Sequence, residues 1–252
     1  MAGERILELK DIAVEFSGFK AVNGLNLGIE RGELRCLIGP NGAGKTTALD
    51  VICGKVKPKA GRIMLKGQDV TRLPEYKLSR RGIGRKFQVP SVFRQLSVRD
   101  NLEVAYCKHL GVFANLVGAK RGAENDGLEK LAELVGLAGL LDQPAGYLSH
   151  GQTQWLEIAL LLAQDSEVIL LDEPTAGMTA QETMHTAKIF NALRGRHTLL
   201  VVEHDMAFVR EISDVITVMH QGKVLAEGRA AEVQRDPAVR EAYLGSGGIA
   251  DA

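Results

Sequence analysis

The chain has 252 residues, of which 45% are hydrophobic and 25% charged, an ordinary composition for one large globular domain or a domain with an inserted lobe. Basic and acidic residues both number 31, so no overall basic field attracts nucleic acid or anionic lipid. The three cysteines lack metal or disulfide spacing, which fits a reducing compartment. The charged amino-terminal stretch predicts no signal peptide, and no apolar run reaches the ~20 residues of a membrane span.

An antiparallel β layer is expected at the start of the chain. Apolar and polar residues alternate over residues 6–16, which predicts a half-buried strand, and a second strand is expected at residues 25–29. Phe16 ends the first of these strands. Its ring either stacks on a purine base or packs in the core, and the residues alone favour the core.

The next stretch organises the whole chain. An apolar run at residues 34–38 predicts a buried strand, and a helix is expected over residues 48–53. Between them lies a glycine, four residues, then Gly-Lys-Thr, formed with one further threonine by Gly39, Pro40, Asn41, Gly42, Ala43, Gly44, Lys45, Thr46 and Thr47. Such a loop turns backbone N–H groups and a helix amino terminus toward a phosphate. Lys45 is expected to reach the β- and γ-phosphates and Thr46 to ligate Mg²⁺. The sequence therefore predicts a nucleoside triphosphate site.

The middle of the chain changes from strand to helix periodicity. A strand predicted over residues 82–87 ends before Gln88, whose amide can ligate Mg²⁺ or a water, although most glutamines in such places do neither. Residues 97–164 are predominantly helical in pattern, with Ser97 as an expected N-cap and residues 118–127 as a polar linker. This block is predicted to form a helical lobe inserted into an α/β core.

Three further segments carry candidate site residues. Ser149 is expected to cap a helix and leave free N–H groups at its start, which makes either a simple capped helix or a second anion site. Asp172 and Glu173 follow a fully apolar strand, where they suit Mg²⁺ coordination through water and polarisation of an attacking water. His204 follows another apolar strand and is either structural or a partner of the γ-phosphate or the water.

The chain resembles the ATP-binding cassette (ABC) ATPases over nearly its whole length. The resemblance rests on five motifs in this order: the phosphate loop, Gln88, the pentapeptide at residues 148–152, Asp172-Glu173 and His204. The resemblance implies an α/β fold: a RecA-like P-loop NTPase core with an antiparallel β subdomain and an inserted α-helical subdomain. The core is expected at residues 1–88 and 166–252, and the helical subdomain at 89–165. The resemblance also implies an enzyme that binds ATP and Mg²⁺ and hydrolyses ATP.

The resemblance assigns roles to single residues. Catalysis is expected to involve Glu173 as general base, His204 as switch, Lys45 and Gln88, and the metal ligands are expected to be Thr46, Gln88 and Asp172. Phe16 becomes a candidate for adenine stacking. In the family two copies face each other head to tail, which places Ser149, Gly151 and Gln152 of one against ATP on the other. Two departures are His150, where glycine is usual, and Thr-Ala-Gly-Met at residues 175–178 in place of Ser-Ala-Leu-Asp.

A narrower resemblance concerns the transported solute. Residues 82–88, 155–158, 176–179 and 242–245 are similar to importer ATPases for branched-chain amino acids and urea, with details that favour the urea type. We therefore expect an ATPase that powers uptake of urea. The first alternative is a branched-chain amino acid importer ATPase. The second is a soluble cassette ATPase of DNA repair or translation, but the chain has neither the long coiled coil of the repair members nor the second cassette of the translation members.

The same resemblance implies the partners. These are a second ABC ATPase subunit, as a homodimer or in the cell a heterodimer, and two membrane permease subunits. A periplasmic or extracellular solute-binding protein is an indirect partner, and no nucleic acid is expected. The groove for a permease helix is expected between core and helical lobe, near residues 88–94. The chain is expected to sit peripherally on the cytoplasmic face of the inner membrane.

Overall fold

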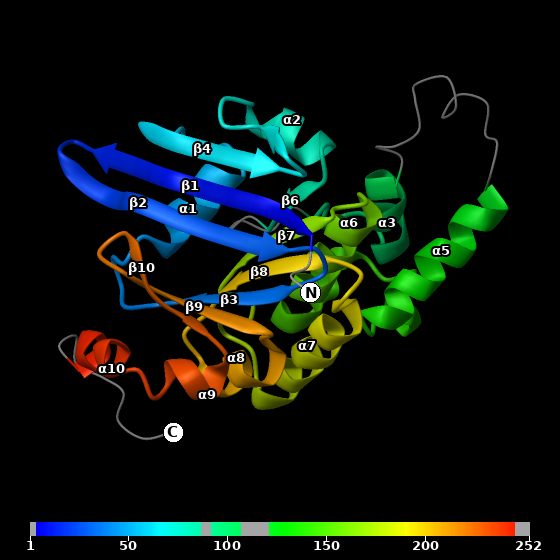
Figure 1. The fold of residues 1–252 in the computed structure, drawn as a ribbon. Coiled ribbons are helices and arrows are strands. Elements are labelled where there is room, and N and C mark those ends of the chain that lie inside the picture. The colour runs from blue at the N-terminus through cyan, green and yellow to red at the C-terminus, as the bar shows by residue number, and fades with distance from the viewer. Residues whose placement is uncertain (1–3, 87–91, 107–120, 245–252) are drawn as a thin grey trace.

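The computed structural model describes residues 4–86, 92–106 and 121–244. A six-stranded sheet with the order β10-β9-β3-β8-β7-β6 forms the centre of the molecule, and a four-stranded sheet with the order β2-β1-β4-β5 lies against it (Figure 1). The central strands are β3 (Leu34–Ile38), β6 (Ile83–Arg85), β7 (Val168–Asp172), β8 (Thr198–Val202), β9 (Val215–His220) and β10 (Lys223–Gly228).

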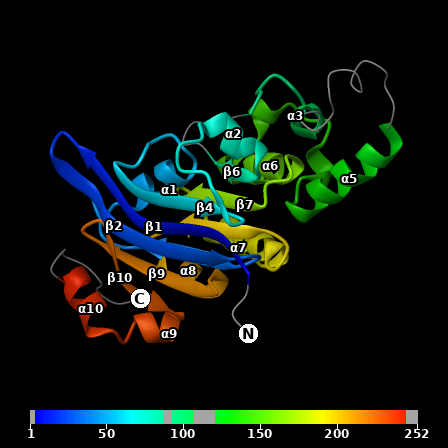
Figure 2. The same cartoon turned by 45° about the horizontal axis from the view of Figure 1, so that its top comes forward.

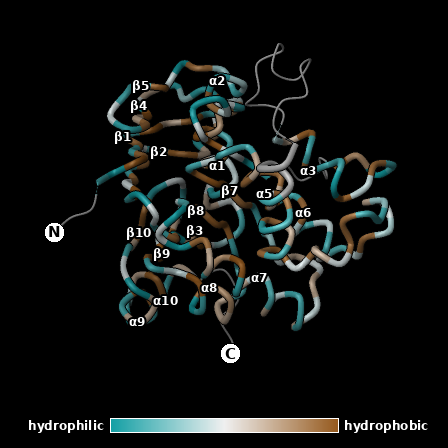
Figure 3. The backbone as a smooth tube through the Cα atoms, turned by 90° about the vertical axis from the view of Figure 1, so that its right-hand side faces the viewer, coloured by the Kyte–Doolittle hydropathy of each residue, from teal (hydrophilic) through white to brown (hydrophobic). Residues whose placement is uncertain are grey.

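The central sheet is parallel from β9 to β6, and only β10 pairs antiparallel, with β9. All residues of β3 and β8 are buried, as expected for strands covered on both faces. Figure 3 shows this as brown, hydrophobic chain around β3, β8 and β7 in the interior. Because parallel strands end at one common edge, the residues that follow β3, β7 and β8 are brought to the same edge of the sheet.

The second sheet is the predicted antiparallel layer. Its strands are β1 (Arg5–Phe16), β2 (Phe19–Glu30), β4 (Ala60–Leu65) and β5 (Gln68–Asp69). The strand expected at residues 25–29 is longer than predicted, because it begins directly after the turn at Ser17 and Gly18, both with positive φ. One hydrophobic core fills the space between this sheet, one face of the central sheet and helix α1 (Lys45–Ile52).

Helices cover the other face of the central sheet and enclose a second core. The remaining helices are α2 (Glu75–Arg80), α3 (Val98–Tyr106), α5 (Arg121–Leu134), α6 (His150–Ala163), α7 (Ala180–Leu193), α8 (Met206–Ile212), α9 (Ala230–Val233) and α10 (Pro237–Leu244). Figures 1 and 2 place α3, α5 and α6 together on one side, away from β1 and β2. This arrangement fits the RecA-like fold, while the predicted subdomain boundaries stay a prediction.

Two local expectations have different outcomes. Ser97 is confirmed as a cap, because its Oγ accepts the N–H of Asp100 at 3.0 Å at the start of α3. The polar linker expected at residues 118–127 is wrong from Arg121 onward, where α5 begins. A glycine inside a helix costs about 1 kcal/mol, and α5 contains two (Gly122 and Gly127). Burial of its apolar face in the second core offsets that cost.

The helices within residues 4–86, 92–106 and 121–244 differ from membrane spans. None of them combines the length and the apolar character that crossing a bilayer requires.

Candidate functional site

Three glycines shape the loop after β3. Gly39, Gly42 and Gly44 have φ values of 148°, 78° and 98°, which favour residues without a Cβ. A Cβ on Gly39 would lie 2.2 Å from the carbonyl oxygen of Met219, and one on Gly44 would lie 2.5 Å from that of Ala21. Gly44 is also the N-cap of α1 and supplies no side-chain hydrogen bond. The first N–H groups of α1 are therefore left to an anionic ligand.

Lys45 lies half-buried over this loop. Its Nζ donates to the carbonyl oxygens of Gly39 at 2.6 Å and Pro40 at 3.1 Å. Burial lowers the pKa of Lys45, while the carboxylates of Glu173 and Asp172 act in the opposite direction. The ammonium group thus hydrogen-bonds its own loop, and it is placed to bond phosphate oxygens in place of these two carbonyl oxygens.

Asp172 ends β7 beside the start of α1. Burial raises the pKa of its carboxyl group, against the opposing effects of a hydrogen bond from Thr46 and the charge of Arg85. Its Oδ2 is buried and has no hydrogen-bond partner. A buried carboxylate oxygen that accepts no hydrogen bond and lies next to a hydroxyl fits Mg²⁺, which prefers oxygen ligands and often takes only one or two carboxylates besides substrate phosphates. Elsewhere, as here, the described residues contain no group of three or more His, Cys, Asp or Glu side chains that could hold a metal ion.

Glu173 and His204 come together at the same edge. Glu173 has a φ of 47°, and its backbone N–H donates to the carbonyl oxygen of Val202 on the adjacent strand at 2.9 Å. Its side chain is 50% exposed, and its Oε1 lies 3.8 Å from Nδ1 of His204. Left-handed backbone at a residue other than glycine costs free energy and is concentrated at functional sites. The strained turn therefore holds the carboxylate at the open edge.

Sequence reasoning missed the role of Glu203. This side chain is 1% exposed and accepts hydrogen bonds from the Thr175 N–H at 3.1 Å, the Thr175 hydroxyl at 2.6 Å and the His204 N–H at 3.1 Å. It therefore ties the turn after Glu173 to the start of the His204 segment. The available signal was a carboxylate placed directly after a strand that is apolar from Leu199 to Val202.

Arg85 on β6 was also missed. Its side chain is 6% exposed, pairs with Asp50 of α1 and donates to Sγ of Cys53 at 3.2 Å. Its Nη2 lies 3.8 Å from Oδ2 of Asp172. The guanidinium group thus links the helix after the phosphate loop to the strand that carries Asp172, although nothing in its local sequence indicates this.

The two aromatic residues at the β1–β2 hairpin face solvent. Phe16 is 48% exposed and Phe19, its cross-strand partner, is 65% exposed, so the interpretation of Phe16 as a core residue is wrong. Strand β2 begins at this hairpin and includes Ala21, whose carbonyl borders Gly44. Phe16 is thus free to take a flat ligand, and its role in adenine stacking stays a prediction.

The pentapeptide at residues 148–152 begins α6. Ser149 is the N-cap, and the N–H of Gln152 donates to its Oγ at 3.2 Å, while the Gln152 side chain accepts the Ser149 N–H at 2.9 Å. The expectation of free N–H groups pointing outward at this start omits a neighbour: the Glu182 carboxylate lies against Gly151, with its Oε1 2.5 Å from where a Gly151 Cβ would be. The Ser149 hydroxyl donates to the same carboxylate at 3.2 Å. The reason is tertiary, since Glu182 comes from the first turn of α7.

His150 links the pentapeptide to the segment after Glu173. Its Nε2 lies 3.0 Å from the carbonyl oxygen of Ala176. The departure from glycine at this position thus adds a contact within the chain. Gln88 lies outside the described residues, so its expected roles in catalysis and metal binding stay predictions.

Known proteins are similar to this chain in sequence over most of its length. The ABC transporter family model matches residues 22–176, and the family model of branched-chain amino acid ATP-binding cassette transporters matches residues 223–249. The chain is 38% identical over 251 residues to BraF of Pseudomonas aeruginosa, a high-affinity branched-chain amino acid transport ATP-binding protein, covering 95% of this chain and 98% of BraF. It is 38% identical over 249 residues to the LivG protein of Escherichia coli, which carries the same description, with 95% and 98% covered.

Solved structures give the same result. The ADP conformation of MJ1267, an ATP-binding cassette of an ABC transporter, superposes with a TM-score of 0.79 at 31% identity, covering 96% of this chain and 99% of that one. The predicted RecA-like α/β fold is confirmed. The chain belongs to the ABC transporter ATPases, a family of ATP hydrolases, in the branch that contains the branched-chain amino acid transport ATP-binding proteins.

Proposed function

We propose that this cassette hydrolyses ATP at the edge formed by Lys45, Thr46, Asp172 and Glu173 and thereby powers the uptake of branched-chain amino acids through membrane permease subunits. The observation that carries the ATP site is the meeting of the phosphate loop with the two carboxylates at the ends of β3 and β7. The observation that carries the solute is 38% identity over 95% of the chain to BraF and LivG.

At the site each residue has a distinct part. The N–H groups at the start of α1 and Lys45 bind the phosphates, and Thr46, Asp172 and Gln88 would hold Mg²⁺. The ion would neutralise charge on the β- and γ-phosphates. Glu173 accepts the proton of the attacking water, a contribution of about 10²–10⁴ in rate for a general base. His204, 3.8 Å from Glu173, orients the water or the γ-phosphate.

A second cassette completes the site in this proposal. Ser149 and Gly151 lie at the start of α6, where Ser149 and His150 contact α7 and the segment before it. A helix amino terminus attracts anions, so the start of α6 is placed to receive the γ-phosphate of ATP bound to a second copy or, in the cell, to a related ATPase. ATP would then be held between the phosphate loop of one subunit and the pentapeptide of the other.

We infer a permease contact at a cavity of about 380 Å³. The groove was expected near residues 88–94, of which 88–91 lie outside the described residues and 92–94 do not line this cavity. The cavity lies between α2 and β6 of the core and α6 of the helical side. Tyr76, Lys86, Glu157 and Leu161 are among its lining residues. The mixture of apolar and charged side chains suits a short helix from a permease subunit, and this surface would place the cassette on the cytoplasmic face of the membrane.

The solute proposed here differs from the first expectation. The sequence favoured urea, with branched-chain amino acids as the alternative, and the named relatives favour that alternative. A periplasmic or extracellular solute-binding protein would supply the amino acid to the permease.

Uptake by intact cells tests this proposal. Cells that lack the gene are supplied separately with labelled leucine and labelled urea at low concentration, and are complemented with the wild-type chain or the Glu173→Gln variant. We expect loss of leucine uptake alone, restored by the wild type only. Loss of urea uptake alone would contradict the proposed solute, and restoration by Glu173→Gln would contradict the role of ATP hydrolysis.

A further inference from the structure

One carboxylate bridges the amino termini of two helices. Oε2 of Glu182 accepts the N–H of Thr179 at 2.9 Å and its hydroxyl at 3.0 Å, which completes the capping box of α7. Oε1 accepts the hydroxyl of Ser149 at 3.2 Å, at the start of α6. The same Oε1 also lies against Gly151, 2.5 Å from where a Gly151 Cβ would be, and the Gly151 N–H helps to lower the pKa of this carboxylate. Glu182 therefore belongs to both helices.

The donors that Glu182 occupies are those proposed to receive the γ-phosphate of the partner's ATP, so the role inferred for Glu182 rests on the proposed function. A serine hydroxyl carries one hydrogen, and so does a backbone amide. The Ser149 hydroxyl cannot donate to Glu182 and to a phosphate at the same time, and the Glu182 carboxylate lies against Gly151 as well. The free chain is thus in an arrangement that the ATP-bound dimer has to give up.

Charge adds to this competition. Hydrogen bonds from the Thr179 N–H and hydroxyl lower the pKa of Glu182, so its carboxylate is negative at neutral pH. A carboxylate and a phosphate at the same helix terminus repel each other. By contrast, the bonds to Thr179 use the other oxygen, so α7 can keep its cap when Oε1 leaves Ser149.

We propose that Glu182 is a built-in counter-ligand of α6, which holds the Ser149 hydroxyl and lies against Gly151 in the free chain, and which has to leave both before the partner's γ-phosphate binds. It thereby sets the ATP concentration at which the dimer closes. Glu182 acts as a positioning residue, since it touches the donors and not the reacting atoms.

The substitution Glu182→Gln separates charge from capping. Glutamine also closes a capping box at this position, so α7 is preserved while the competing negative charge is lost. Glu232→Gln is the matched control, because Glu232 occupies the same position in the capping box of α9 and makes the same change in charge. Midpoints of thermal unfolding show whether the variants remain folded.

The measurement is ATP-dependent dimer formation by the full chain in a Glu173→Gln background, followed by analytical ultracentrifugation over a range of ATP concentrations. We expect Glu182→Gln to lower the half-saturating ATP concentration by about fivefold or more, the lower end of usual coupling effects, and Glu232→Gln to leave it unchanged. With Glu173 intact, Glu182→Gln is expected to lower KM for ATP without lowering kcat, whereas loss of a merely structural contact would not lower KM.

Two outcomes overturn the inference and are distinguishable. If the Glu173→Gln chain forms an ATP-dependent dimer and the added Glu182→Gln change requires the same or a higher ATP concentration, Glu182 is not a counter-ligand. The proposed dimer with ATP between its subunits would still stand. If the Glu173→Gln chain forms no dimer at any ATP concentration although it binds ATP, the proposed dimer itself is wrong, and the inference falls with it.

Discussion

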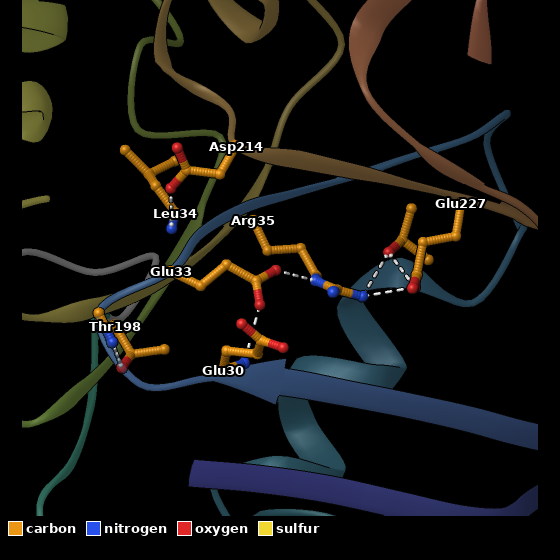
Figure 4. A network of polar contacts seen from close by, with 9 residues as sticks. Glu30, Glu33, Leu34, Arg35, Thr198, Asp214 and Glu227 are labelled. Carbon is orange, nitrogen blue, oxygen red and sulfur yellow. Dashed lines mark hydrogen bonds and ion pairs between the residues drawn. The ribbon is translucent and has the colours of Figure 1, made fainter. Parts of the chain in front are cut away.

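The charged residues at the two ends of the central strands differ in whether they are paired within the chain. Near the amino end of β3, Arg35 is 4% exposed and pairs with Glu33 at 2.5 Å and with Glu227, while Thr217 bonds both Arg35 and Glu227 (Figure 4). Asp214 accepts the Leu34 N–H at 2.9 Å in the same region. These groups satisfy one another within the chain, as buried polar groups must.

At the carboxyl ends of the central strands, polar groups remain available to bind a ligand. Lys45 donates to carbonyls of its own loop, and Oδ2 of Asp172 is buried without a hydrogen-bond partner. Glu173 and His204 are exposed by 50% and 71%. The comparison teaches that mutual satisfaction indicates a structural role, and that unsatisfied or self-satisfied groups at a strand edge indicate a ligand.

The largest expected effect on stability comes from Arg35→Met. Removing one partner of a buried ion pair costs about 3–5 kcal/mol, because the carboxylates of Glu33 and Glu227 lose their cation. Urea denaturation measures this loss, and ATP affinity of the folded variant is expected to be unchanged. Lys59→Met removes a 68% exposed partner of Glu15 and is expected to cost far less stability, because exposed ion pairs contribute little. Equal losses in both variants would contradict the structural role of Arg35.

Lys45→Ala is expected to act on binding instead. The loss of a charge-assisted contact to phosphate predicts roughly 100-fold weaker ATP binding, about 3 kcal/mol, measured by calorimetry. Stability is expected to change by less than about 1 kcal/mol, because the lysine bonds only carbonyls of its own loop. Lys55→Ala, which removes a 58% exposed partner of Asp50, serves as control. Unaltered ATP affinity in Lys45→Ala would remove the lysine from the site.

Ser149→Ala sharpens the comparison because Ser149 both caps a helix and is proposed to contact ATP. Loss of an N-cap costs about 1 kcal/mol, and the dimer is expected to need more ATP, while the affinity of the single chain for ATP stays the same. Ser97→Ala removes the equivalent cap of α3 and should match the loss of stability only. If both variants form the dimer alike, Ser149 has only the structural role.

Glu227→Gln is expected to have the smallest effect. Its side chain is 42% exposed, and glutamine can still accept a hydrogen bond from Arg35. We expect a loss of less than about 1 kcal/mol by urea denaturation and unchanged ATP hydrolysis. A tenfold fall in hydrolysis would show that this end of the sheet is not merely structural.

Much of this arrangement could be predicted from the sequence because its signals are local. The buried strand at residues 34–38, the glycine loop and the acids after residue 171 are each contained in a short stretch, and parallel pairing brings their ends together. Glu203, Arg85 and Glu182 escaped prediction because each also bonds a residue far away in the sequence, namely Thr175, Asp50 and Ser149. The tertiary packing that forms a helix across two glycines in α5 is equally invisible to local patterns.

ATP hydrolysis by purified Glu173→Gln tests the central claim most directly, because this carboxylate is proposed to take the proton of the attacking water. Turnover is expected to fall by about 10²–10⁴-fold relative to the wild type, while ATP affinity of the single chain stays within about twofold. Unchanged turnover would contradict the assignment of Glu173 as base and with it the proposed chemistry at this edge of the sheet.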